Sequence, residues 1–280
     1  MTTTTHPLFG TYSLDGEETI SVGQVPTPYQ TYDGHGTLIG GTADLTAIKD
    51  ILRSEQVHPL QTSSGRAVMA IWIVDFSEAS LGPHNELQLS ILVSHQPLQA
   101  INSHPLTLLY ALFANPDARM FCWKLWNNTE KVVAYNRELL GLDAKLNQGT
   151  IRREDGRKAF HFVDEAGSLI LEGQVKVEKR TAPVVGWQLF RLLGLRQTLK
   201  AFSQPYLGAK VVNPISDAIP FNGDAQSYVA SDTPIVQWFD TSTDAIQFGE
   251  IVSSSIDFQP AFVEHFAPFR FVYLQPQNPK

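Results

Sequence analysis

Residues 68–93 read VMAIWIVDFSEASLGPHNELQLSILV, and this stretch decides the fold. Two runs rich in Ile, Val and Leu, 68–76 and 87–93, are separated by a turn signal at Gly82-Pro83. Runs of this length and composition predict β-strands, and a Gly-Pro pair between them predicts a turn. The second run alternates at first and becomes apolar on both faces at Leu92. The stretch therefore predicts two buried neighbouring strands.

The rest of the chain adds many strands and few helices. Further strands are predicted at 119–125, 158–163, 168–177, 208–213, 226–230, 235–239, 246–254 and 269–274. Helices are predicted at 43–53, with Thr42 or Asp44 as its cap, at 131–142 and at 185–202. This pattern favours an α+β fold of mostly antiparallel strands, curled into a closed β-barrel or cone with a few peripheral helices. Because no composition shift divides the chain, we expect one domain over 1–280, with 1–21 as a peripheral arm.

Composition narrows the class of protein. The 280 residues carry 21 Lys and Arg against 28 Asp and Glu, and the net charge of −7 argues against nucleic-acid binding. Cys122 is the single cysteine, so no intramolecular disulfide can form. The N-terminus lacks a signal-peptide pattern, and no apolar run is long enough to span a membrane. We therefore expect a cytoplasmic protein, in which the sequon Asn127-Asn128-Thr129 is accidental.

Common cofactor and metal motifs are missing. Gly34-His35-Gly36, followed by Gly40-Gly41, departs from the spacing of phosphate-binding loops and is interpreted as a tight turn. The eight histidines show no metal-ligand spacing. No GxSxG nucleophile elbow occurs. We expect neither cofactor nor metal.

Three segments carry residues suited to chemistry. Glu86 begins the strand after the Gly-Pro turn; pointing into a barrel, its carboxyl would have a raised pKa suited to acid–base work. The alternative is a strand-edge glutamate in solvent. Arg137 ends a helix and Lys145 follows it, either as site cations or as surface charges beside a helix C-terminus. The third segment, 248–255, reads FGEIVSSS and has the alternation of a strand.

Taken in order, these segments resemble the acetoacetate decarboxylase superfamily. His84-Asn85-Glu86 after Gly82-Pro83 is similar to the family's Gly-Pro-Tyr-Asn-Glu turn. Residues 136–139 and 142–146 resemble its Gly-Arg-Glu-Leu stretch and Tyr-Pro-Lys-Lys-Leu tail, and 250–255 repeat its Glu-Ile-Val-Ser-Ser-Ser strand. The resemblance covers about 22–274. It implies a closed barrel or cone, an enclosed apolar pocket and a homo-oligomer.

The resemblance also implies a mechanism from which this sequence departs. Acetoacetate decarboxylase itself uses a buried lysine, whose pKa is lowered by its surroundings, to form a Schiff base with a ketone. Alignment on Arg137 places Ala144 at the Schiff-base lysine and Lys145 at its cationic neighbour, with Asp143 in place of the preceding proline. The family site has two acidic residues. This sequence has a counterpart for one of them, Glu86.

We therefore predict an enzyme that acts on a hydrophobic carbonyl compound, polyketide- or terpenoid-like, by acid–base or pocket-templated chemistry. Dehydration, isomerisation, cyclisation and lysine-free decarboxylation fit this description. Glu86 is the predicted acid or base and His84 its partner, while Lys145 and Arg137 supply positive charge. The alternatives are a Schiff-base enzyme using Lys145 and a non-catalytic protein that binds hydrophobic ligands.

Two apolar features bear on the substrate. The predicted helix 185–202 is apolar with scattered basic residues. Such a helix could act as a lid or contact a membrane surface. The alternative is a helix packed on the barrel or buried in an oligomer interface. Phe121, Trp123 and Trp126 suggest either an apolar pocket or core.

Overall fold

The computed structural model describes residues 6–113, 115–179, 181, 186–187, 207–212, 224–231, 235–250, 252 and 256–275. The helices are α1 (Pro7–Thr11), α2 (Leu45–Ile51), α3 (Pro105–Phe113) and α4 (Glu130–Glu138). The strands are β1 (Gly16–Ile20), β2 (Gly23–Thr27), β3 (Tyr29–Asp44), β4 (His58–Pro59), β5 (Arg66–Ala79), β6 (His84–Ser94), β7 (Arg119–Asn127), β8 (Ala144–Leu146), β9 (Gln148–Glu154), β10 (Arg157–Val163), β11 (Leu169–Lys176), β12 (Leu207–Val212), β13 (Asp224–Ser231), β14 (Ile235–Trp238), β15 (Ala245–Phe248), β16 (Gln259–Phe266) and β17 (Phe269–Leu274).

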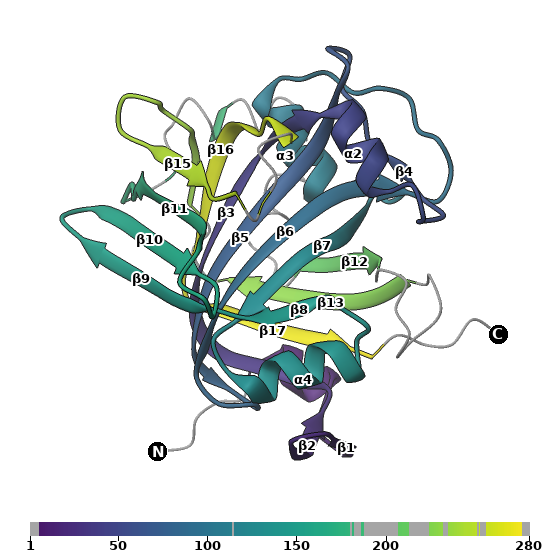
Figure 1. Ribbon diagram of the computed structural model, residues 1–280, viewed down its shortest axis with the longest axis vertical. Coiled ribbons are helices and arrows are strands. Elements are labelled where there is room, and N and C mark those ends of the chain that lie inside the picture. The colour runs from purple at the N-terminus through teal and green to yellow at the C-terminus, as the bar shows by residue number, and fades with distance from the viewer. Residues whose placement is uncertain are drawn as a thin grey trace.

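The strands form three sheets, shown in Figure 1. The largest has eleven strands, a second contains β15, β11, β10 and β9, and a third is the hairpin of β1 and β2. Strand β5 lies between β3 and β6 in the large sheet. Among the described strands, only the pairings of β7 with β12 and with β8 are parallel. The predicted mostly antiparallel fold is therefore confirmed.

The large sheet is strongly curled, and the predicted closed barrel is borne out only in part. Seven strands pair in a circuit, β3, β5, β6, β7, β12, β13 and β17, whereas β16, β14 and β4 extend from it as an open sheet. The curl arises because β17 pairs both with β13 and with the first residues of β3, Tyr29–Thr31. Within the described residues the sheet still ends in edge strands, β14 on one side and β4 on the other. The architecture is thus a curled sheet whose concave face is partly enclosed.

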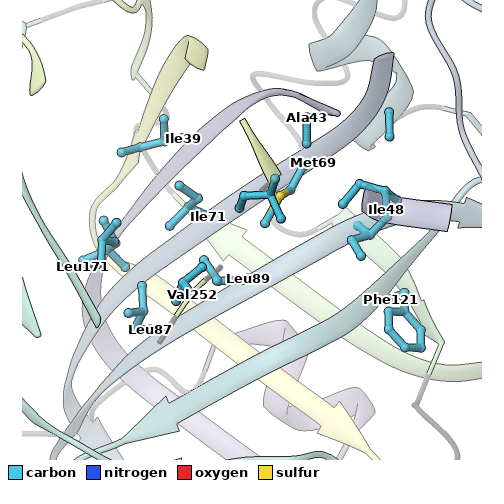
Figure 2. Packing of buried hydrophobic residues seen from close by; sticks show 14 of the residues in the cluster. Ile39, Ala43, Ile48, Met69, Ile71, Leu87, Leu89, Phe121, Leu171 and Val252 are labelled. Atoms are coloured by element: carbon cyan, nitrogen blue, oxygen red, sulfur yellow. The ribbon is translucent and has the colours of Figure 1, made fainter. Parts of the chain in front are cut away.

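The hairpin of β5 and β6 explains why residues 68–93 are apolar on both faces. Successive side chains of a strand point to opposite faces of a sheet. Met69, Ile71 and Leu89 face a core that also contains Leu171 from β11, as Figure 2 shows. Residues of the other parity, including Trp72, face the concave side, where α3 covers part of a second core. Both faces are buried, so both must be apolar.

Strand β3 is a correction to the sequence interpretation, because the glycines between Gly34 and Gly41 lie inside a 16-residue strand and not in a tight turn. A Cβ at Gly40 would overlap the ring of Phe262 on β16, and one at Gly41 would overlap the carbonyl oxygen of Gln259. The glycines allow neighbouring strands to approach closely.

The helices agree with the sequence in part. Helix α2 is capped by Asp44, whose carboxylate accepts from the backbone N–H of Ala47 at 2.8 Å. Helix α4 begins one residue before the predicted helix 131–142 and ends four residues before it. Helix α3 was not predicted. The predicted helix 185–202 and the Ser-rich segment 253–255 lie outside the described residues, apart from 186 and 187. Of the helices described, none has the length and apolarity needed to cross a membrane.

Candidate functional site

A small, partly open cavity lies on the concave face of the large sheet. Its wall is mainly aromatic and aliphatic, with side chains from β5, β6, β7, β13 and β17 and from the loop before β8. These residues are Trp72, Val74, Phe76, Met120, Leu142, Val229, Phe269, Phe271 and Tyr273. Gln88, Cys122 and Ser227 add uncharged polar groups. Among the described lining residues, Glu86 alone is ionisable as an acid near neutral pH and none is basic. Such a cavity suits a mainly apolar small molecule.

Glu86 faces this cavity because of its parity on β6. It shares a face with Gln88, and it retains some accessible surface because it borders the cavity. Directly opposite on β7 stands Asn127, the cross-strand partner of Glu86. The Asn127 amide Nδ2 donates to Glu86 Oε2 at 3.0 Å. The register of two strands therefore gives the carboxylate one fixed hydrogen bond.

The surroundings of Glu86 favour its neutral form. Burial raises the pKa of Glu86 from 4.5 to about 7, and the hydrogen bond from Asn127 offsets part of this increase. Nearby, burial and then the Glu86 charge raise the pKa of the Tyr29 hydroxyl and of the Cys122 thiol. Burial also raises the pKa of Tyr273, with Cys122 and Glu86 as smaller causes. These three groups remain uncharged near neutral pH, where Glu86 exchanges its proton.

His84, predicted as the partner of Glu86, is hydrogen-bonded elsewhere. Its Nδ1 lies 2.8 Å from the carbonyl oxygen of Gly82, which can only accept, so Nδ1 carries the proton. Its Nε2 then accepts from the Tyr29 hydroxyl at 2.8 Å. Burial lowers the pKa of His84 to about 4. The structure thus places His84 in a neutral, structural role that braces the turn before Glu86.

Positions 144 and 145 point to opposite sides of β8. Ala144 is 1% exposed and packs in the cluster that contains the wall residues Cys122 and Leu142. Lys145 is exposed, with 56% of its side chain accessible, and its Nζ lies 3.9 Å from the exposed Asp143. The position aligned with the family lysine therefore faces inward and holds a methyl group, whereas Lys145 faces outward.

The other predicted cation also lies outside the cavity. Arg137 is exposed near the end of α4, beside a surface hollow next to the hairpin of β1 and β2. The adjacent Glu138 accepts a hydrogen bond from the backbone N–H of Ser21 at 2.9 Å. The structure brings neither Arg137 nor Lys145 to Glu86.

The aromatic residues predicted for the pocket belong to a core. Phe121 and Trp126 are buried in the cluster between the large sheet and the second sheet, and Trp123 packs against it. Their neighbours of opposite parity, Met120 and Cys122, line the cavity instead. Of the two interpretations, pocket or core, the structure shows that these three rings belong to the core.

Several buried polar residues were missed by sequence reasoning. Asn127 and Asn136 are 0% and 5% exposed.

Glu264 on β16 is buried without a hydrogen-bond partner for Oε2 among the described residues, and burial raises its pKa to about 8. Lys158 on β10 is buried as well; its Nζ lies 3.4 Å from the carbonyl oxygen of His35, and burial lowers its pKa to about 8. An acid or lysine inside an otherwise apolar strand was the available signal. Neither lines the cavity.

No metal site accompanies the cavity in the part of the chain that the structure describes, where no group of three or more His, Cys, Asp or Glu side chains could hold an ion.

Comparison with solved structures identifies the architecture. The acetoacetate decarboxylase from Legionella pneumophila is similar with a TM-score of 0.60 and 12% identity, over 96% of this chain and 94% of that one. MppR, an enduracididine biosynthesis enzyme complexed with pyruvate, has a TM-score of 0.57 and 10% identity, over 94% and 97%. An acetoacetate decarboxylase-like enzyme from Sphingomonas wittichii RW1 has a TM-score of 0.50 and 12% identity, over 90% and 93%.

Sequence comparison alone does not reach this result, because no family model and no curated protein matches the chain. The likeness is one of fold, carried by nearly the whole length of both chains. The chain therefore has the acetoacetate decarboxylase-like fold, as its short sequence motifs predicted.

Proposed function

We propose that this protein is an enzyme that removes or delivers a proton beside the carbonyl group of a neutral, hydrophobic small molecule, with Glu86 as the general base or acid. The observation that carries the proposal is the carboxyl of Glu86 in an apolar cavity, with a pKa of about 7. A general base works best when its pKa lies near the working pH, because it is then both ionised and basic.

Proton transfer next to a carbonyl group is the step common to dehydration, isomerisation and cyclisation of such compounds. The base must take a proton from carbon, while a neutral donor hydrogen-bonds the carbonyl oxygen as charge develops there. Gln88 lines the same cavity as Glu86; its side-chain amide donates one N–H to Ser90 Oγ at 2.6 Å, and its second N–H is the donor proposed for a carbonyl oxygen. This supports enolisation chemistry without a covalent intermediate.

The charge of the described lining favours a neutral substrate over a keto acid. A substrate carboxylate would meet the ionised Glu86 with no described lining cation to balance it. Burying two like charges in an apolar cavity is unfavourable. The family-type decarboxylation of a keto acid is therefore the less suitable chemistry for this cavity.

The experiment is solvent deuterium exchange into cyclohexanone, followed by NMR. We expect the wild-type protein to catalyse exchange, and Glu86→Gln to lose it by roughly 100-fold or more, as for removal of a general base. Acetoacetate serves as the anionic comparison and is expected to remain intact. Equal exchange by the wild-type protein and a well-folded Glu86→Gln would refute the proposal.

A second candidate function is ligand binding without turnover, and one observation favours it. The inward position of β8 holds Ala144, so the cavity remains while the family nucleophile is absent. This reading predicts binding of cyclohexanone-like ligands by both wild-type protein and Glu86→Gln, with no exchange by either. The remaining alternative, an imine on Lys145, is disfavoured by the outward position of that side chain. Borohydride trapping with a ketone, followed by mass spectrometry, tests it directly.

A further inference from the structure

A chain of two side-chain amides leads from helix α4 to Glu86. Asn136 Nδ2 donates to Asn127 Oδ1 at 2.9 Å, and Asn127 Nδ2 donates to Glu86 Oε2 at 3.0 Å. Asn127 and Asn136 are almost fully buried, so water does not substitute for these partners. Asn136 projects from the buried face of α4, whereas Asn127 ends β7. Two elements thus converge on one carboxylate.

The orientation of the Asn127 amide decides which form of Glu86 it supports. With Nδ2 toward Glu86, the amide donates to a carboxylate; with Oδ1 toward Glu86, it would accept from a protonated carboxyl group. An isolated asparagine could turn to suit either form. Asn136 opposes that turn, because turning Asn127 alone would set its N–H against the N–H of Asn136.

We propose that Asn127 and Asn136 are positioning residues, in which Asn136 locks the Asn127 amide with its N–H toward Glu86 and so supports the ionised carboxylate of the site. The proposal rests on Glu86 being the working acid or base of the proposed function. The two influences on the Glu86 pKa agree with it, because burial raises this pKa whereas the hydrogen bond from Asn127 lowers it.

Among the described groups, only Asn127 lowers the pKa of Glu86. The ionisable groups that interact with it are Tyr29 on β3, Cys122 on β7 and Tyr273 on β17, and each has a raised pKa. They stay neutral where Glu86 titrates. His84, on the same strand, is neutral above its pKa of about 4. The amide pair is therefore the device that counteracts desolvation.

The test is the titration of Glu86 itself, followed by NMR of carboxyl-labelled glutamate and assigned by the signal lost in Glu86→Gln. Loss of a hydrogen bond to a charged group is expected to raise the Glu86 pKa by about one pH unit or more. We expect this in Asn136→Leu and in Asn136→Ala, which both remove the group that holds the Asn127 amide and introduce no charge. Asn147→Leu is the matched control, because Asn147 is as buried as Asn136 and its side-chain amide has no hydrogen-bond partner among the described residues, whereas its backbone N–H, which donates to the carbonyl oxygen of Asn127, is kept in the variant.

A double-mutant cycle separates a relay from independent effects. Asn127→Leu alone should raise the Glu86 pKa, and adding Asn136→Leu should then change it no further. Equal effects of Asn136→Leu in both backgrounds, or an unchanged pKa in Asn136→Leu and Asn136→Ala, would overturn the proposal. The titration does not depend on turnover. An active Glu86→Gln would refute the proposed function while leaving the relay standing, and an unshifted pKa beside an inactive Glu86→Gln would refute only the relay.

Discussion

Glu86→Gln tests the electrostatics of the cavity without knowledge of the substrate. In the fold the pKa of Glu86 is about 7, against an ordinary value of 4.5. The native state therefore binds this proton more tightly than the unfolded state. The contribution of this group to the free energy of unfolding is largest below pH 4.5. It decreases as the pH rises to about 7 and stays low above that. Glutamine cannot ionise, and its Oε1 can still accept from Asn127.

The shift corresponds to about 3 kcal/mol, which we reduce to about 2 kcal/mol because part of the side chain borders a cavity that is open to solvent. Near pH 8 we expect Glu86→Gln to be more stable than the wild-type protein by that amount, and near pH 4.5 the two should be equal. The assay is urea denaturation at both pH values. Other titrating groups, such as Glu264, are common to both proteins and cancel in the comparison.

The control is Glu165→Gln at an exposed turn, where the stability difference should remain small at both pH values. If Glu86→Gln changed the free energy of unfolding equally near pH 4.5 and pH 8, the carboxyl would not carry a raised pKa, and the reasoning about the cavity would be wrong.

Three further predictions concern other parts of the fold. Ala144→Lys should create a borohydride-trapped ketone adduct at that position, whereas wild-type protein should show none on Lys145; an adduct on Lys145 would contradict its outward placement. Lys158→Met should stabilise the protein by about 2 kcal/mol near pH 7, since the folded pKa of about 8 lies below 10.5, and the gain should vanish as the pH rises through 8 to 10.5; a gain independent of pH would count against a buried charge. Gly41→Ala should lower the free energy of unfolding by more than about 2 kcal/mol, because the new Cβ overlaps backbone of β16, while Gly10→Ala, with open space around it, should be neutral or slightly stabilising. Equal thermal unfolding of the two glycine variants would refute that explanation.

The hairpin at 68–93 was predictable because burial on both faces leaves a local record of long apolar runs. Asp44 was one of two caps predicted for α2, with Thr42, and it could be predicted because a cap acts on N–H groups only a few residues away. Strand β3 was not predictable, because Gly40 and Gly41 have the composition of a turn. Their actual requirement comes from β16, more than 200 residues later in the chain.

Glu86 was identified from its place after the Gly-Pro turn, but its partner was not. The contact with Asn127 depends on the register of β6 against β7, which includes an irregularity between Leu89 and Ser90. Local sequence does not encode such a register. The outward position of Lys145 depends likewise on β8 being extended, because alternation in a strand reverses a side chain at every step.

The cavity wall has a consequence for how the protein acquires its binding site. Trp72 lies on β5 and Tyr273 on β17, about 200 positions apart in the sequence, yet both border the same space. The last wall strand to leave the ribosome, β17, joins β13 to β3 and completes the curl. Until then, the growing chain carries the apolar concave face of β5 and β6 without its cover. Contacts between such distant segments form slowly, so we expect folding late in synthesis and a need for protection of that face while translation proceeds.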